Sequence, residues 1–278
     1  MNYHRHGGIP SSWREKLGEF EIYFMIRYLI AIITGSVSIL ALFLTTKFPS
    51  LVPFSIIVGI WFLFLLASYL YIFQKSKEKW LDLGFLFVSL LSYLSLVLLI
   101  ENTQLKFFLI LLSGVATAFL FFKSPTQDLE LPHEKKIMRR GTVMIGVFNV
   151  YALVSMLFAL SLYFQMLPFV IFTVLGIIII FYFSIISWQS YLALPFRELA
   201  LFGGVVALVM GEIIWVLHYL SLGYFVLGLI CVWLWYNLML LIRFNLTPDG
   251  IIWKKQWRFL GANVIILFLL LFFVVRWI

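Results

Sequence analysis

The sequence predicts an all-α fold: a polytopic integral membrane bundle of nine transmembrane helices with a cytoplasmic N-terminus. Of its 278 residues, 64% are hydrophobic and 12% are charged, and the mean hydropathy is +1.08. Soluble domains hold roughly 45–50% apolar and about 25% charged residues, so lipid must solvate much of this chain. The apolar residues also form runs of about 20, the length that a helix needs to cross roughly 30 Å of hydrocarbon. Lysine and arginine, finally, are sorted between alternate loops.

Each apolar run is expected to form a continuous helix, because backbone groups in lipid must be hydrogen-bonded within their own segment. The prolines fall in loops or first turns, where they cost little. The fourth run is short for a full crossing. The expected spans are Ile22–Thr46, Leu51–Phe73, Leu81–Ile100, Phe107–Phe122, Gly141–Phe164, Pro168–Leu192, Leu199–Leu220, Tyr224–Ile242 and Phe259–Ile278.

The loops predict the orientation of these spans. With the N-terminus inside, 17 of the 20 Lys and Arg residues lie on the cytoplasmic side, and only Lys47, Lys106 and Arg276 lie outside. We therefore expect a multi-pass protein of the bacterial cytoplasmic membrane, with its C-terminus outside. The net charge of +8 is explained by this topology and by contact with anionic lipid headgroups at the cytoplasmic face, so no nucleic-acid partner is expected. Arg27, one or two turns into the first span, is expected to snorkel to the inner interface.

Similar short segments open corresponding spans. Residues 51–54 and 166–169 open the second and sixth spans, and residues 106–109 and 223–226 open the fourth and eighth. The nearly constant spacing predicts two four-helix halves with parallel topology, followed by a ninth helix; chance similarity among Phe- and Leu-rich helices is the alternative. The predicted parts are a cytoplasmic segment 1–21 with a short interfacial helix, a first half 22–122, a basic linker 123–140, a second half 141–242, a basic loop 243–258 and a ninth helix 259–278.

Glu212 is the one clear ionisable side chain at membrane depth, thirteen residues into the seventh span. Such groups are costly in lipid and are candidate functional sites. Trp215 and Tyr219 follow on the same helical face, so an indole N–H and a phenol are expected near the carboxyl group. Glu212 then either binds a ligand, proton or cation, or forms an interhelical hydrogen bond, for instance to Asn149 of the fifth span or Asn237 of the eighth.

Other features of the sequence carry weaker predictions. Gly203, Ala207 and Gly211 recur every four residues on the seventh span and predict close helix packing. On the outer side, Glu101 and His218 are candidates for a surface site, although two such groups do not make a convincing metal or catalytic centre. Ser89, Ser92 and Ser95 form a hydroxyl stripe on the third span, whose commoner explanation is bonding back to their own helix.

The predicted function is non-catalytic: a membrane-embedded subunit or binding scaffold for protein, lipid or an apolar ligand. A small-solute or proton-coupled carrier that uses Glu212 is the alternative, and a lipid-modifying enzyme near Glu101 and His218 ranks third. No metal site and no cofactor are expected. The expected partners are the lipid bilayer with its anionic headgroups and other membrane subunits.

Overall fold

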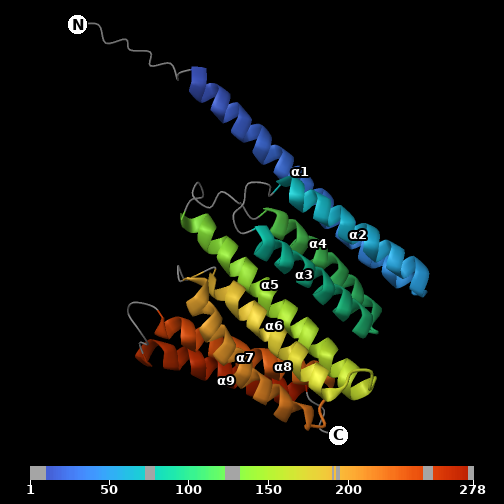
Figure 1. Ribbon diagram of the computed structural model, residues 1–278, viewed down its shortest axis with the longest axis vertical. Coiled ribbons are helices and arrows are strands. Elements are labelled where there is room, and N and C mark those ends of the chain that lie inside the picture. The colour runs from blue at the N-terminus through green and yellow to red at the C-terminus, as the bar shows by residue number, and fades with distance from the viewer. Residues whose placement is uncertain are drawn as a thin grey trace. The chain divides into compact units, whose positions relative to one another are not determined.

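The computed structural model describes residues 11–72, 79–122, 132–189, 191, 195–246 and 253–274, and all regular elements in these ranges are helices (Figure 1). This confirms the all-helical prediction for the described part of the chain. The elements are α1 (Ser11–Lys47), α2 (Leu51–Ile72), α3 (Lys79–Leu99), α4 (Thr103–Phe122), α5 (Pro132–Phe158), the π-helix η1 (Ala159–Tyr163), α6 (Phe169–Gln189), α7 (Phe196–His218), α8 (Tyr224–Asn245) and α9 (Trp253–Val274).

Eight of the described helices, α1 to α8, contain segments long and apolar enough to cross a membrane. The protein is therefore a polytopic membrane protein. The apolar segments are Met25–Lys47, Leu51–Ile72, Leu81–Leu99, Thr103–Phe122, Ile137–Tyr163, Phe169–Gln189, Phe196–His218 and Tyr224–Asn245. In α9 the described apolar stretch is the shorter Leu260–Leu269. The ninth span, the cytoplasmic N-terminus and the repeat of two four-helix halves stay predictions.

The fourth span is longer than the sequence suggests. Its helix begins at Thr103, four residues before the apolar run, and has 20 residues, or about 30 Å. Asn102 precedes it, and its side-chain Oδ1 accepts a hydrogen bond from the backbone N–H of Leu105 at 3.0 Å. This is the N-cap interaction that satisfies one of the unpaired amides of a first turn. The cap extends α4 to a length that can cross the bilayer.

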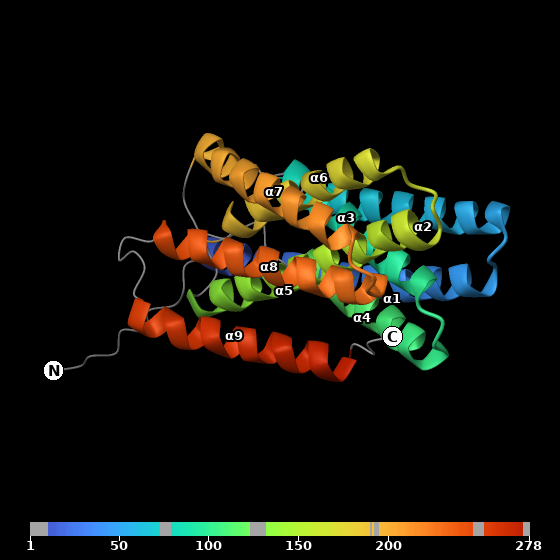
Figure 2. The ribbon, with the colours of Figure 1, turned by 90° about the horizontal axis from the view of Figure 1, so that it is seen from below.

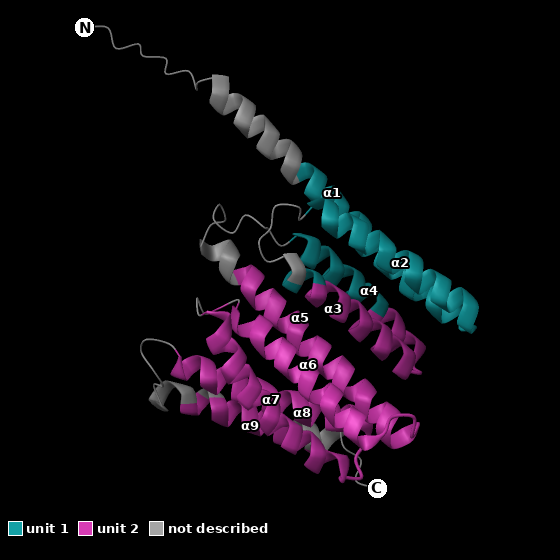
Figure 3. Ribbon diagram, in the orientation of Figure 1, with its two compact units in different colours: residues 1–83, 110–129 teal, residues 84–109, 130–278 magenta. Residues whose placement is uncertain are grey.

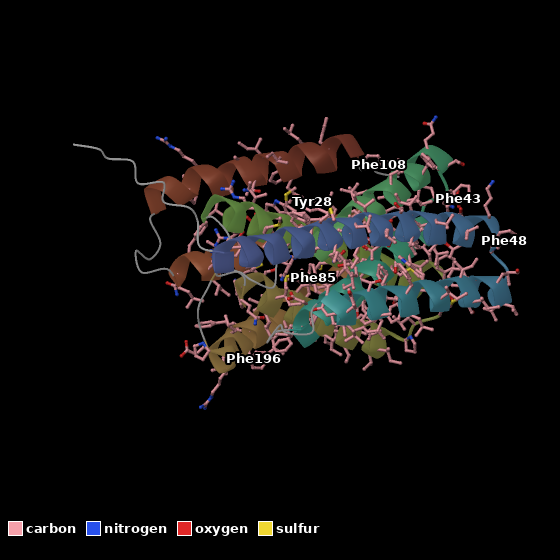
Figure 4. The ribbon with its side chains drawn as sticks, turned by 90° about the horizontal axis from the view of Figure 1, so that it is seen from above. Tyr28, Phe43, Phe48, Phe85, Phe108 and Phe196 are labelled. Atoms are coloured by element: carbon pink, nitrogen blue, oxygen red, sulfur yellow. The ribbon has the colours of Figure 1, made fainter. Side chains whose placement is uncertain are left out.

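Apolar side chains also cover the outside of the helices, as lipid requires. Phe43, Phe48, Phe108 and Phe196 are all exposed, whereas Phe85 is buried, and Figure 4 labels these side chains. Large exposed apolar side chains recur along the described parts of α1 to α7 and α9, whereas α8 has none. Monomeric soluble proteins rarely expose such continuous apolar surface, so this surface supports a membrane environment.

The chain divides into two compact units (Figure 3). Unit 1 comprises residues 1–83 and 110–129, and unit 2 comprises residues 84–109 and 130–278. The residues of the predicted interfacial helix from Ser11 onward form the start of α1. Residues 1–10, most of the predicted linker at 123–131 and the centre of the basic loop at 247–252 lie outside the described ranges.

Unit 1 is held together by close contacts of α1 with α2 and with the C-terminal part of α4. The buried Trp61 of α2 donates its indole N–H to the Oγ of Ser38 on α1 at 3.1 Å. One turn before Ser38 on α1, a Cβ added at Gly35 would lie 2.7 Å from the backbone oxygen of Gly114 on α4. The two glycines therefore allow the backbones of α1 and α4 to approach more closely than side chains would permit.

Arg27 connects the same two helices. Its side chain is 6% exposed, and its Nη2 and Nε donate to the backbone oxygens of Phe122 at 2.8 Å and Phe121 at 3.4 Å. These carbonyls end α4, where the last carbonyls of a helix have no partner within it and the helix dipole favours a cation. The end of another helix thus binds the guanidinium inside unit 1, a contact that the sequence did not indicate, and the position of Arg27 at the inner interface stays a prediction.

In unit 2, α5 packs against α6 and α8, α7 packs against α6 and α8, and α9 packs against α8 (Figure 2). Trp188 of α6 donates to the backbone oxygen of Met239 on α8 at 3.1 Å, and Trp235 of α8 donates to the Oγ of Ser184 on α6 at 2.9 Å. Both indoles are fully buried. This reciprocal pair satisfies two buried donors and fixes the register of α6 on α8.

The apolar helix of α5 ends in the π-turn η1. Its last bonds run from the N–H of Phe164 to the oxygen of Ala159 and from the N–H of Met166 to the oxygen of Leu160, both at 3.0 Å. Between them Gln165 adopts a φ of 51°, the left-handed conformation common where helices end. Pro168 then precedes α6. The predicted end of the fifth span, at Phe164, therefore coincides with a tight reversal of the chain.

Candidate functional site

The predicted site residues lie mainly on α7, and the packing of this helix determines which way they face. Pro195 precedes α7 with an extended backbone, and Glu198 supplies a negative charge in the first turn, where the helix dipole favours it. One face of α7 is buried. Its residues are Leu199, Gly203, Val206, Ala207, Met210, Gly211, Ile214 and Leu217.

Glycines let this face approach α6 closely. A Cβ added at Gly203 would lie 3.2 Å from Cγ1 of Ile185, and one at Gly211 would lie 2.8 Å from Cδ1 of Ile177, both on α6. In return, a Cβ at Gly176 of α6 would lie 2.9 Å from Cδ1 of Ile214 on α7. Isoleucines of each helix thus occupy the space left by glycines of the other. This interlocking sets the rotation of α7 and turns its opposite face outward.

We call that outward surface the α7 face. All its members are exposed and are spaced alternately by four and three residues, the spacing at which one helix presents a seam to another. The members are Leu201, Val205, Leu208, Glu212, Trp215 and Tyr219. Side chains around Glu212 on this face are apolar or aromatic, so the carboxyl group is an isolated polar group on a surface that lipid would otherwise cover.

Glu212 lies well inside the apolar length of the helix. It stands six residues before His218, the last residue of α7, or about 9 Å from that end. Within the part of the chain that the structure describes, it has no hydrogen-bond or ion-pair partner. A charged side chain within a membrane helix is costly, by up to roughly 2.5–3.5 kcal/mol at the centre of the helix. The position is therefore unfavourable unless something else contacts the carboxyl group.

Trp215 and Tyr219 share the face of Glu212, as the sequence indicates, but they are bonded to each other. The indole N–H of Trp215 donates to the hydroxyl oxygen of Tyr219 at 3.2 Å, and the two side chains are 52% and 73% exposed. Phe169, at the start of α6, packs against Trp215 with ring centroids 5.5 Å apart. Tryptophan and tyrosine with one apolar and one polar end are typical of membrane interfaces. They form an aromatic group at the end of α7, one turn from Glu212.

His218 belongs to the same aromatic group. Its ring lies 4.7 Å from that of Phe169 and 5.3 Å from that of Phe172, and its Nδ1 is buried without a hydrogen-bond partner in the described ranges. Glu101 is exposed and interacts electrostatically with the hydroxyl group of Tyr224. The structure places no hydrogen bond or ion pair between Glu101 and His218, both of which it describes. The two outer-surface candidates are therefore not brought together as a site.

Asn149 and Asn237 are engaged away from Glu212. The fully buried Asn149 donates from Nδ2 to the Oγ of Ser89 on α3 at 2.7 Å, and its backbone oxygen accepts from Ser92 at 3.4 Å. Asn237 donates to the backbone oxygen of Trp233 on its own helix at 2.8 Å. The side-chain oxygens of both asparagines are buried without a partner in the described ranges. Neither amide contacts Glu212, and Asn149 joins α5 to α3.

The serine hydroxyl groups on α3 also contribute to the packing of α3 against α5. Ser89, Ser92 and Ser95 donate to the backbone oxygens of Phe85, Val88 and Leu91, each at 2.7 Å. A hydroxyl that bonds to the preceding turn of its own helix is satisfied without a polar path through the protein. Ser89 uses its remaining acceptor capacity for Asn149. The stripe is thus accounted for by bonds within α3 and by two hydrogen bonds to Asn149, one at Ser89 and one at Ser92.

Replacing Asn149 by leucine is expected to lower the free energy of unfolding by about 0.6–2 kcal/mol, the range of single interhelical hydrogen bonds in membranes. The loss follows from removing the bond to Ser89, and reversible unfolding of the purified protein in mixed micelles would measure it. Ser95→Ala is the matched control on α3, because Ser95 bonds only to its own helix. An Asn149→Leu variant as stable as the Ser95→Ala variant would contradict the packing role.

Sequence reasoning missed two sets of contacts between helices. The first is the pair of hydrogen bonds that Trp188 and Trp235 donate between α6 and α8, and the second is the capping of α4 by Arg27. No local pattern marks either, since their partners lie 51 and 94 residues away. Among the described residues no group of three or more His, Cys, Asp or Glu side chains could hold a metal ion. Cys231 is buried in α8. No known protein family, curated protein or solved structure matches the chain.

Proposed function

We propose that the protein is a non-catalytic, membrane-embedded binding subunit whose α7 face docks another membrane protein. One observation carries the proposal: Glu212 is exposed on an apolar helix face and has no partner among the described residues. In lipid, interactions between helices rely on packing and on polar groups that find each other across the contact. A carboxyl group on an otherwise apolar seam is such a polar group, and its partner then lies on a second chain.

The positions of the other candidate residues favour this scaffold over a carrier. A carrier needs Glu212 on a path inside the bundle, whereas its exposure places it on the outside of unit 2. The serine stripe is bonded to its own helix, and the indole of Trp215 donates to Tyr219. No hydrogen bond or ion pair joins Glu101 to His218, both described, so their contacts add no support for a lipid-modifying site. These observations leave the α7 face as the feature that most needs a functional explanation.

The cytoplasmic membrane location and the contact with anionic headgroups remain part of the proposal. Five described arginines of unit 2 lie near the helix ends that the predicted topology places inside: Arg139 and Arg140 on α5, Arg197 on α7, Arg243 on α8 and Arg258 on α9. Arg243 is held over the ring of Tyr191, 4.4 Å from its centroid. Clustered arginines at one end of a helical bundle suit the negative inner leaflet.

Site-specific photocrosslinking in native membranes tests the proposed docking. A photoreactive residue at Leu201, Val205 or Leu208 is expected to form adducts with one protein species, identified by mass spectrometry of its peptides. Ile178, exposed to 54% on α6, is the control position and is expected to label lipid only. Protein adducts are expected only at positions spaced by three or four residues along the α7 face, because a docked helix contacts one side of α7. Equal labelling at Ile178, or lipid adducts alone on α7, would refute the proposal.

A further inference from the structure

The chemistry around Glu212 narrows the choice of partner. The members of the α7 face that flank it, Leu208 and Trp215, offer no free donor, because Leu208 is apolar and the indole N–H of Trp215 is already donated to Tyr219. Exposed Val209 and Val216 border the same surface. Between Leu208 and Trp215 the α7 face thus presents one carboxyl group, able to carry a negative charge, with apolar contact area on both sides.

Glu212 is also badly placed to reach water or lipid headgroups. Side chains on a helix lean toward the helix N-terminus, and the nearer end of α7 is its C-terminus at His218. The carboxyl group is therefore directed toward the middle of the helix. Lysine and arginine can snorkel on long stems, but a glutamate has a short one. The compensating group must come from within the apolar layer.

Resting on the proposed docking function, we propose that the occupant of the α7 face is a transmembrane helix of a different protein that carries a lysine or arginine at the depth of Glu212. The two opposite charges would meet across the helix contact and remove each other's cost in lipid. Apolar side chains one turn above and below the basic residue would pack on Leu208 and Trp215, at the spacing of a helix seam.

A second copy of this chain fits the face less well. A two-fold interface brings the same surface of both copies together, so the isolated carboxyl groups of the two Glu212 residues would face each other. Two like groups in an apolar layer do not neutralise their charge. The arginines of described α7 and α8, Arg197 and Arg243, lie near the ends of their helices that are farther from Glu212, and the ring of His218, at the nearer end, packs against Phe169 and Phe172. Charge complementarity therefore favours a foreign helix over self-association.

Binding of synthetic helices to the full chain tests this inference. The protein, labelled with a donor fluorophore, is reconstituted into phosphatidylcholine vesicles with leucine-rich peptides of the same length as α7 that carry an acceptor fluorophore. One peptide has a single lysine at the depth of Glu212, and the others have leucine or glutamate there, or the lysine near the opposite end. Energy transfer is expected to show the first peptide binding about tenfold more tightly than the other three.

Variants of the receptor face connect any preference to the carboxyl group. In Glu212→Gln the preference for the lysine peptide is expected to disappear, and in Glu212→Lys the glutamate peptide is expected to bind most tightly. Because Glu212 is exposed, both substitutions are expected to leave the fold intact. Thermal melting at the wild-type temperature would show that both variants are folded. Equal binding of all peptides to the wild type, or a lysine preference that survives Glu212→Gln, would overturn the inference. So would energy transfer between two copies of the chain that Glu212→Gln abolishes.

The two proposals fail separately. Adducts that follow the helical repeat of the α7 face, together with a wild-type protein that ignores the lysine peptide, would retain the docking function and refute a basic partner. Absence of protein adducts would refute the docking function itself, whatever the peptides do. A preference for the lysine peptide together with patterned adducts on a membrane protein that has a lysine or arginine at this depth would support both.

Discussion

Leucine in place of Gly35 is expected to lower the free energy of unfolding by about 3 kcal/mol or to prevent unit 1 from forming, because overpacking a tight contact costs roughly 1–3 kcal/mol and sometimes more. A Cβ at Gly35 would lie 2.7 Å from the backbone oxygen of Gly114 and 3.0 Å from Cβ of Ala118. A backbone atom cannot move aside as a flexible side chain can. The helices α1 and α4 would have to separate, and thermal melting of the purified protein would measure the loss.

Gly59→Leu is the matched control for this variant. Gly59 lies in the apolar helix α2, and a Cβ added there meets no atom within 4 Å. Leucine is also the better helix former, so this variant is expected to melt at or slightly above the temperature of the wild type. If Gly35→Leu and Gly59→Leu melted together, the close approach of α1 to α4 would not be a feature of the folded protein.

Methionine in place of Arg27 is expected to lower the free energy of unfolding by about 1.5–3 kcal/mol, the range for hydrogen bonds that involve a charged group. Methionine keeps an apolar stem of similar length but cannot donate to the carbonyls of Phe121 and Phe122. The end of α4 then keeps buried acceptors without their cation. Equilibrium unfolding in mixed micelles would measure the difference.

Two further variants distinguish capping from charge alone. Arg139→Met removes an exposed arginine and is expected to leave stability unchanged. Arg27→Lys keeps the charge but replaces the two-nitrogen contact by a single ammonium group, so an intermediate stability is expected. Should Arg27→Met unfold at the same denaturant concentration as Arg139→Met, the guanidinium would contribute nothing to the attachment of α4.

The sequence was sufficient for those parts of the fold that depend on local properties. The apolar runs predict the eight described spans, since crossing a bilayer requires a minimum apolar length. The observed end of a span differs from the predicted one where a polar residue determines where the helix begins. Asn102 caps α4, which therefore starts four residues before its apolar run. The recurrence of Gly203, Ala207 and Gly211 also indicates the packed face of α7, because only small residues allow such an approach.

The candidate site was harder to predict, because it depends on which face of each helix turns outward. Periodicity places Glu212, Trp215 and Tyr219 on one face, but the sequence does not say whether that face meets protein or lipid. The orientation of this face is set by glycines of α7 and α6, which pack against isoleucines of the other helix. As a result, Glu212 faces away from the other helices of unit 2. The partners of Asn149 and Arg27 depend on contacts between helices far apart in the chain.

The attachment of Arg27 also has a consequence for the order in which the protein is made. Phe121 follows Arg27 by 94 residues, and a ribosome adds about 5–20 residues per second, so roughly 5–20 s separate their synthesis. Throughout that interval the guanidinium lacks the α4 carbonyls that it binds in the finished protein. The first hairpin, α1 with α2, is complete long before then. Assembly of unit 1 is therefore timed by the insertion of its last helix.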